Sequence, residues 1–178
     1  MTITITPFFE KEANDYATIS RSFTSNRHDF HEGGLNAKEK KMFEGKLGEK
    51  AIKQFFLNNN IMFEEDKSSH EVADYYDFIV YALDGRELKV DVKTRTQNFH
   101  TRTLEMVEQI KNKPKDIYFS VRLHDTIPFT VDLIGFTTKQ DFFKINRIQN
   151  QGYLDNYVLF DNELREINTI IHKLKKNE

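Results

Sequence analysis

Two runs rich in apolar residues lie between residues 75 and 95 on either side of a polar turn, and this pattern predicts two β-strands joined by a tight turn. The expected strands cover residues 75–82 and 86–95, and both are rich in valine, isoleucine, tyrosine and phenylalanine. Asp84-Gly85 lies between them and is a strong turn signal. We treat this hairpin as the element around which the rest of the chain is organised.

The length of the connecting loop decides which residues of the two strands face each other. A two-residue turn at Asp84-Gly85 would set Phe78 against Asp91 and mix apolar with charged residues on both faces. A three-residue loop over residues 83–85, with Gly85 in the left-handed conformation, sets Phe78 against Val90 instead. Because only the second arrangement produces a fully apolar face, we predict the three-residue loop.

That register gathers three charged residues on the other face of the hairpin. Asp77 lies opposite Asp91, and Lys93 follows two residues later on the same side. Buried charges are costly unless they are paired or bound to a cation, and two carboxylates on rigid strands suit a hard divalent ion. Asp74 is the alternative to Asp77 as the second acid. We favour Asp77 because it belongs to the apolar strand.

The segment Asp91-Val92-Lys93, with an acidic residue on the preceding strand, resembles the core of the PD-(D/E)XK nuclease superfamily. That superfamily includes many restriction enzymes and Holliday-junction resolvases. The sequence departs from its pattern at Tyr76, which stands where the name-giving proline would be. The resemblance covers roughly residues 38–145. It implies an α/β fold with a restriction-endonuclease-like core, in which a central mixed β-sheet is flanked by helices and its antiparallel hairpin carries the site.

The same resemblance implies a metal-dependent nuclease, expected to be an endonuclease, that hydrolyses phosphodiester bonds of DNA. Mg²⁺ is the expected cofactor, with Mn²⁺ as a substitute, and a homodimer is expected by analogy. Asp77, Asp91, the Val92 carbonyl and Glu49 would hold the metal, while Lys93 would orient or deprotonate the attacking water. The alternatives are a catalytically inactive nuclease fold that binds nucleic acid or docks a protein, and a structural domain whose charged residues merely pair.

A helix is predicted from Asn36, which would cap it, to about residue 57, because apolar residues recur there at helical spacing. Gly45 and Gly48 lower helix propensity and indicate close approach to a neighbouring element. Glu49 lies at the edge of the apolar stripe. The resemblance implies that such a helix adds one acid to the metal site, and the alternative is a solvated glutamate paired with Lys53.

Four residues are expected to contact nucleic acid. Arg95 and Arg102 lie in or beside the polar stretch 94–103 and suit a phosphate backbone. Gln109, in a helix predicted over residues 103–112, resembles a glutamine that some superfamily members place after the lysine. Lys46 is the fourth candidate, on the helix that carries Glu49.

Further elements follow from the same patterning. Strands are predicted over residues 61–65, 116–123 and 130–136. A capping box at residues 138–141 predicts a short helix to residue 144, and a last helix is predicted over residues 161–175.

We expect residues 1–36 to form an N-terminal arm or extension with a short edge strand, and residues 37–178 to form one nuclease-like domain that ends in the last helix. The segment His28–His31 fits no helical metalloprotease spacing and is assigned to the surface. With 178 residues and 30% charged residues the chain is typical of a globular protein. The formal net charge of −2 disfavours bulk coating of nucleic acid, and no membrane segment is expected. The absence of cysteine excludes disulfides and thiolate catalysis, and we expect a cytoplasmic location.

Overall fold

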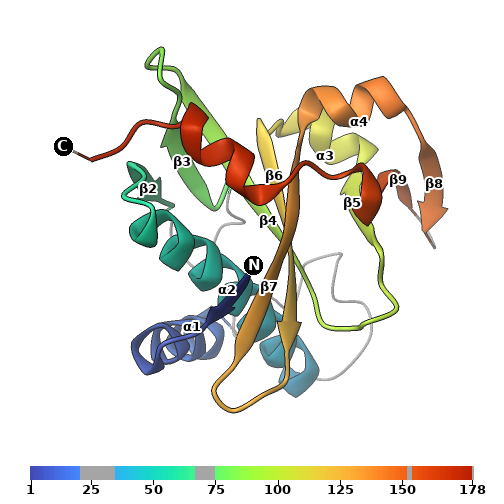
Figure 1. Ribbon diagram of the computed structural model, residues 1–178. Helices are drawn as coiled ribbons and strands as arrows, with labels where there is room; N and C mark the ends of the chain where they lie inside the picture. Colours follow the sequence, from blue (N-terminus) through green and yellow to red (C-terminus); the bar gives the residue numbers. More distant parts are fainter. Residues whose placement is uncertain (21–34, 67–74, 152–153, 178) are drawn as a thin grey trace.

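The computed structural model describes residues 1–20, 35–66, 75–151 and 154–177. The chain forms a mixed six-stranded sheet and a three-stranded antiparallel sheet, with helices packed around them (Figure 1). The spatial order of the larger sheet is β1, β7, β6, β4, β3, β2. These strands are β1 (Thr2–Thr4), β2 (Phe63–Glu65), β3 (Phe78–Tyr81), β4 (Glu87–Arg95), β6 (Ile117–His124) and β7 (Thr130–Thr138). The predicted α/β class with a mixed sheet flanked by helices is confirmed.

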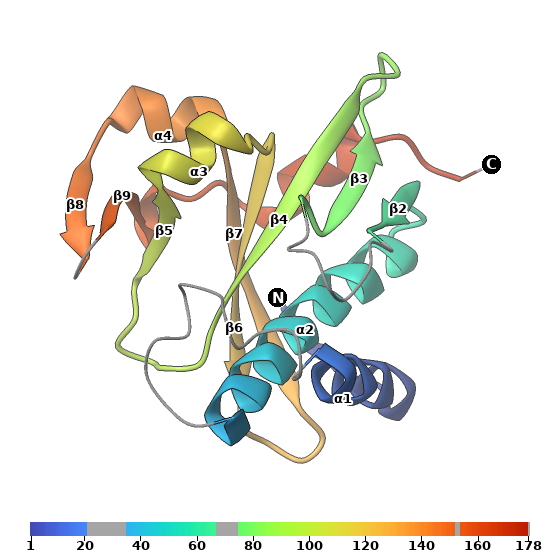
Figure 2. The same ribbon diagram turned by 180° about the vertical axis from the view of Figure 1, so that it is seen from behind.

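The smaller sheet and the helices complete the fold. The smaller sheet has the order β5 (Arg102–Met106), β9 (Leu154–Phe160), β8 (Ile148–Gln151). The helices are α1 (Pro7–Ser20), α2 (Leu35–Asn58), α3 (Val107–Asn112) and α4 (Lys139–Ile145), followed by the 3₁₀ helices η3 (Asp161–Glu163) and η4 (Ile167–Lys173). The view from behind shows α1 and α2 on one side of β4 and the smaller sheet with α3 and α4 on the other (Figure 2).

The hairpin of β3 and β4 has the register that the apolar face predicts. Phe78 pairs with Val90, and Val80 pairs with Leu88. Gly85 has a φ of +89°, and its amide donates a hydrogen bond to the Ala82 carbonyl at 2.9 Å. The three-residue loop is therefore confirmed, together with the left-handed glycine that closes it.

Strand β4 lies at the centre of the larger sheet and meets α2 at a glycine. A Cβ atom built on Gly48 would lie 1.9 Å from Thr94 Oγ1, so only glycine lets the helix approach the strand this closely. The predicted close approach is confirmed at Gly48. A Cβ on Gly45 would meet no atom within 4 Å, so close approach does not explain that glycine.

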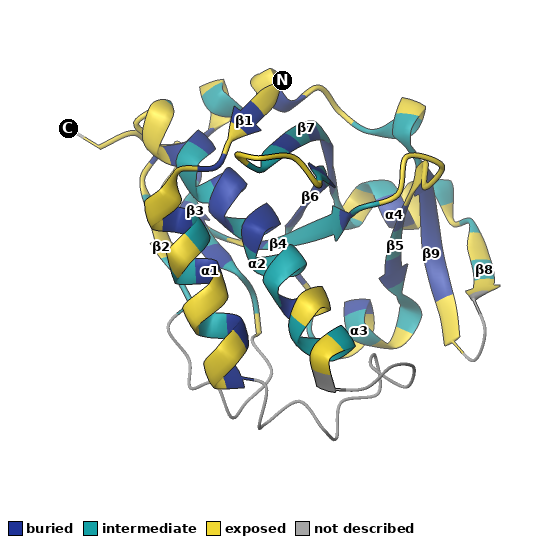
Figure 3. Ribbon diagram, turned by 90° about the horizontal axis from the view of Figure 1, so that it is seen from below, coloured by how far each residue is buried: buried dark blue, intermediate teal, exposed yellow. Residues whose placement is uncertain are grey.

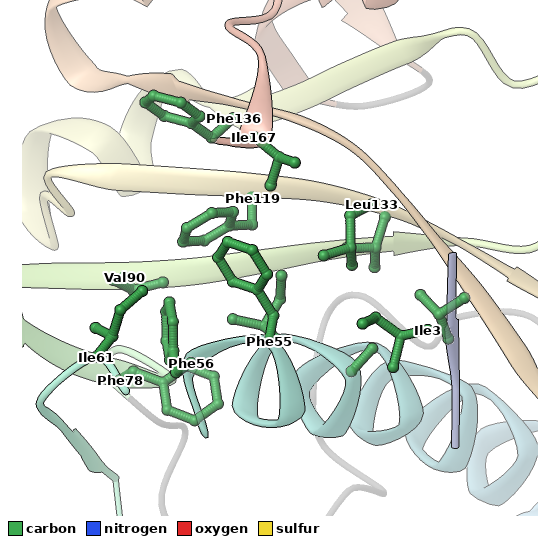
Figure 4. Packing of buried hydrophobic residues seen from close by; sticks show 14 of the residues in the cluster. Ile3, Phe55, Phe56, Ile61, Phe78, Val90, Phe119, Leu133, Phe136 and Ile167 are labelled. Atoms are coloured by element: carbon green, nitrogen blue, oxygen red, sulfur yellow. The ribbon is translucent and has the colours of Figure 1, made fainter. Parts of the chain in front are cut away.

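The main hydrophobic core fills the space between α2 and the larger sheet (Figure 4). Phe56 is fully buried, and its ring centroid lies 5.5 Å from that of Phe78 and 5.8 Å from that of Phe119. The burial pattern also shows α1 with buried and exposed faces, because Ala13 and Ala17 face inward (Figure 3). A second cluster, around Tyr118 and Phe142, packs on the other face of β6. Both faces of the sheet at β4 and β6 are thus covered.

Two predicted helices are wrong in whole or in part. The helix expected over residues 103–112 is strand β5 followed by the short α3, because residues 102–106 pair with β9 about fifty positions later in the chain. The helix expected over residues 161–175 is instead the two 3₁₀ helices, η3 and η4. Isoleucines 167 and 170 still face the core, since a 3₁₀ helix also places residues three apart on one side.

The N-terminal residues and one helix boundary also differ from expectation. Residues 1–20 contribute β1 to the larger sheet, as the predicted edge strand, and the helix α1, which was not predicted. Helix α2 begins at Leu35, so Asn36 lies inside the helix and does not cap it. Strands β8 and β9 were not predicted either. The segment His28–His31 and the alternative acid Asp74 lie outside the described residues.

Candidate functional site

Asp77 lies at the point where β3 and β4 separate, one residue before β3 begins. Its amide donates to the Val90 carbonyl at 2.8 Å, and its Oδ2 accepts a hydrogen bond from the Val92 amide at 2.6 Å. Beyond this position β3 no longer pairs with β4. The carboxylate therefore occupies the place of a backbone partner for the middle residue of Asp91-Val92-Lys93.

Asp91 and Lys93 lie on the opposite face of β4 from the apolar residues and form a charged quartet with Glu105 and Lys115. Lys93 Nζ lies 2.8 Å from Asp91 Oδ2 and 2.7 Å from Glu105 Oε2. Lys115 Nζ lies 3.4 Å from Asp91 Oδ1 and 4.0 Å from Glu105 Oε1. Two ammonium groups and two carboxylates thus alternate, and their formal charges cancel.

Burial makes this charge balance necessary. The Glu105 side chain is 0% exposed and that of Lys115 is 6% exposed, whereas Lys93 keeps 29% exposure. Charges that leave water are tolerated only when opposite charges or hydrogen bonds replace the lost hydration. Lys93 is therefore the quartet's link to solvent, and Glu105 is its most deeply buried member.

Sequence reasoning missed Glu105 and Lys115. Glu105 was placed in a predicted helix, where a glutamate would be solvated, whereas it points inward from strand β5. A usable signal was present in Thr103, Glu105 and the apolar residues between and after them, because their alternation is typical of a strand. Lys115 follows Pro114 in a connecting segment and offered no such pattern.

The charges around Asp77 and Asp91 shift their acidities in opposite directions. Burial, together with the negative charges of Glu49 and Asp91, raises the pKa of Asp77 well above its ordinary value. Burial alone would also raise the pKa of Asp91, but Lys93 and Lys115 outweigh it and lower that pKa. Two neighbouring acids with diverging pKa values are common at functional sites.

Lys93 and Glu105 both bind protons more strongly than usual. Burial by itself would lower the pKa of Lys93, but Asp91 and Glu105 outweigh it and the pKa is raised. Burial raises the pKa of Glu105, an effect that the nearby Lys93 only partly opposes. Lys93 is accordingly a fixed ammonium ion in this arrangement.

Helix α2 brings Glu49 and Lys46 to the Asp77 side of the site. Glu49 is 13% exposed and pairs with Lys46 at 2.7 Å, while Lys53 pairs with Glu65 at 2.5 Å. The alternative interpretation of Glu49, a solvated glutamate paired with Lys53, is therefore wrong. Lys46 also lies 4.1 Å from the centre of the Tyr16 ring.

The other candidates for nucleic-acid contact are divided between structural and exposed positions. Arg95 is buried, and its guanidinium binds Asp161 Oδ1 at 2.5 Å and the His100 carbonyl at 2.8 Å. Arg102 is exposed and donates to Gln149 Oε1 at 3.1 Å. Gln109 is partly buried on α3, and in the described part of the chain no hydrogen bond joins its side chain to Asp91 or Lys93.

The oxygen donors fit a hard cation by type, but they are not assembled around one. Asp77, Asp91 and Glu49 offer carboxylates, and Val92 offers a carbonyl, which are the donors that Mg²⁺ prefers. Within residues 1–20, 35–66, 75–151 and 154–177, no three acidic or histidine side chains converge closely enough to hold a metal. Lysine ammonium groups take that place beside Asp91, so a bound cation would have to compete with them.

Comparisons with known protein families, with curated proteins and with solved structures found no match for this chain. None of the helices in the described residues is both long and apolar enough to cross a membrane. The fold and site define an α/β protein with a mixed sheet. An acidic residue lies at the end of one hairpin strand, and the next strand carries two members of a largely buried lysine–carboxylate quartet.

Proposed function

We propose that the chain is a Mg²⁺-dependent nuclease of the PD-(D/E)XK type that hydrolyses DNA. One observation carries the proposal: the hairpin register anchors the Asp77 carboxylate on the amide of Val92, within the segment Asp91-Val92-Lys93. The element order supports it as well. Helix α2, the antiparallel strands β2, β3 and β4, and the parallel strand β6 follow the order expected of a restriction-endonuclease-like core.

In this proposal each side chain has a separate task. Asp77, Asp91, Glu49 and the Val92 carbonyl would hold the cation, with Asp77 also fixing the backbone of Val92. When bound, the cation supplies positive charge that polarises the phosphate and acidifies a water molecule. Lys93 would stabilise negative charge on the phosphate. Its raised pKa favours this role over proton abstraction, because a lysine that retains its proton is a poor base.

The neutralised quartet favours a second candidate, a nuclease-like fold that binds nucleic acid or a protein without catalysis. Asp91 already has two lysine partners, at 2.8 Å and 3.4 Å, so its charge is satisfied without a metal ion. The two candidates differ only in whether a divalent cation binds and cleavage follows.

A cleavage assay tests the proposal. Supercoiled, linear and four-way-junction DNA are incubated with the purified protein and Mg²⁺ or Mn²⁺, with EDTA as the metal-free reference. We expect metal-dependent cleavage by the unmodified chain and a loss of about 10²-fold or more in Asp91→Asn and Lys93→Ala. Asp91→Asn is preferred to Asp91→Ala, because it keeps the shape of a side chain that lies between two lysines.

Two variants on the same strand serve as controls. Glu87→Ala and Lys89→Ala remove one acid and one lysine from exposed positions of β4, and both should cleave as the unmodified chain does. Circular dichroism establishes that all four variants fold. Full activity in Asp91→Asn and Lys93→Ala would reject the nuclease proposal, whereas DNA binding without any cleavage by the unmodified chain would favour the inactive candidate.

A further inference from the structure

A pocket of about 530 Å³ lies next to the charged quartet and is not explained by it. Lys93 and Ser120 contribute to its wall from the larger sheet. Phe99 and His100 contribute from the connection between β4 and β5, and Arg102 contributes from the first position of β5. None of its lining residues is acidic. Its volume falls in the range of roughly 300–1,000 Å³ that is typical of sites for small molecules.

The aromatic residue at this pocket is unusually exposed for its size. Phe99 is 75% exposed, the highest value among the phenylalanines of the described chain. Its ring packs edge-on against that of His100, with a centroid distance of 4.6 Å. A large exposed aromatic ring beside positive charge is the arrangement on which single-stranded nucleic acids stack their bases.

The backbone that carries Phe99 is anchored at its neighbour. The His100 carbonyl accepts hydrogen bonds from Arg95 at 2.8 Å and from Arg122 at 3.1 Å. Both arginines also pair with Asp161, at 2.5 Å and 3.7 Å. The exposed ring is therefore presented by a fixed backbone, which lowers the entropic cost of binding a ligand.

Arg102 supplies charge that is available to a ligand. It is exposed, its hydrogen-bond partner Gln149 is uncharged, and it takes part in no ion pair within the described residues. By contrast, Asp161 neutralises Arg95, and Asp91 and Glu105 neutralise Lys93. Arg102 is thus the cation of this pocket best placed to bind a phosphate.

We propose that this pocket binds one unpaired nucleotide of DNA, with the base stacked on Phe99 and a phosphate on Arg102. The inference rests on the proposed nuclease function and adds a substrate class to it, namely DNA with single-stranded or branched segments. A paired base cannot enter without leaving its stack, which costs free energy that an unpaired base does not pay. The next phosphate would then lie near Lys93, which shares the pocket wall.

Binding without cleavage tests this inference. Fluorescence anisotropy in EDTA compares a labelled single strand with a blunt duplex of the same sequence. We expect Phe99→Ala to weaken single-strand binding about ten-fold, with little effect on the duplex, and Phe99→Trp to restore it. Phe8→Ala, at another exposed phenylalanine on α1, should change neither affinity.

Salt dependence separates the two contacts. Arg102→Ala should reduce the slope of log affinity against log salt by about 0.7, the contribution of one phosphate contact on a single strand, whereas Phe99→Ala should leave it unchanged. Arg86→Ala, at the exposed hairpin tip, is the charge control.

The outcomes distinguish this inference from the nuclease proposal. Equal losses on single strand and duplex, no loss in Phe99→Ala, tighter binding of the matching RNA strand, or no single-strand binding at all would each overturn the pocket assignment. Cleavage that persists in those cases leaves the nuclease proposal standing. Stacking on Phe99 without any metal-dependent cleavage would retain the pocket and remove the nuclease.

Discussion

The Asp77 carboxylate makes a favourable backbone hydrogen bond, but its negative charge is unfavourable at this position. It accepts the Val92 amide hydrogen bond at 2.6 Å, which a neutral amide oxygen could also do. Its negative charge, however, is partly buried and lies close to the negative charges of Glu49 and Asp91. Binding sites often keep such unfavourable groups because the ligand relieves them. In the proposed nuclease, the relieving ligand is a cation.

This conflict predicts that Asp77→Asn stabilises the metal-free protein at neutral pH. A carboxyl group whose folded-state pKa is raised stabilises the fold below its unfolded pKa, and that contribution is lost as the pH rises through the folded-state value. Asparagine cannot ionise, so the variant should melt at a higher temperature near pH 7, and the difference should shrink toward pH 4. Thermal unfolding followed by circular dichroism in EDTA measures it.

Asp84→Asn is the matched control at the opposite end of the same hairpin. The Arg86 side chain lowers the pKa of Asp84, so this carboxyl favours its ionised form. Replacing it should give no stabilisation at neutral pH. If Asp77→Asn melts at or below the temperature of the unmodified chain near pH 7, then the ionised Asp77 carboxylate does not destabilise the folded protein.

At the scale of elements, residues with strong local signals were predicted and residues with distant partners were not. The hairpin register followed from which residues give an apolar face, and the helix α4 followed from its capping box, in which Thr138 and Asp141 bond reciprocally. Strand β5 was mistaken for a helix because its partner β9 lies far along the chain. No tight turn joins the two strands, so the local sequence does not indicate that they pair. Helix α1 was missed because Phe9 is the only large apolar side chain among its four buried residues, the others being alanines and a serine.

The residues of the candidate site fall into the same two groups, those predicted from local sequence and those missed because their partners are distant. Asp77, Asp91 and Lys93 were predicted because one hairpin carries all three, and register alone relates them. Glu105 and Lys115 come from separate elements, and only the packing of β5 against the larger sheet places them beside Lys93. Arg95 was predicted as a binding residue but has a structural contact instead. An arginine in a polar stretch fits a phosphate contact by composition, but burial against Asp161 gives it a structural role that composition does not indicate.

The two glycines of α2 predict opposite effects of the same substitution. Gly48→Ala would place a Cβ 1.9 Å from Thr94 Oγ1, so helix and strand must separate, and we expect a loss of about 1–3 kcal/mol in the free energy of unfolding. Gly45→Ala meets no atom within 4 Å and should stabilise the helix by up to about 1 kcal/mol. Urea unfolding of both variants measures the difference. Equal effects at the two positions would contradict the close contact between α2 and β4.

At the scale of the molecule, the candidate site lies where the two sheets and α2 meet. The larger sheet supplies Asp77, Asp91 and Lys93, α2 supplies Glu49, and β5 of the smaller sheet supplies Glu105. The proposed nucleotide pocket opens beside them, between β4 and the connection to β5. A net charge of −2 is compatible with DNA binding here, because the cations of the pocket are local and several acids belong to the site itself.

The most direct measurement of the central claim is a calorimetric titration with Mn²⁺ and Mg²⁺, since everything proposed for the site depends on a cation among these acids. We expect the unmodified chain to bind the metal and Asp77→Asn and Asp91→Asn to bind it at least about ten-fold more weakly, while Glu87→Ala binds it normally. The same cation should raise the melting temperatures of the unmodified chain and of Glu87→Ala, and raise those of Asp77→Asn and Asp91→Asn much less. No binding, or the same affinity in all four proteins, would contradict the account.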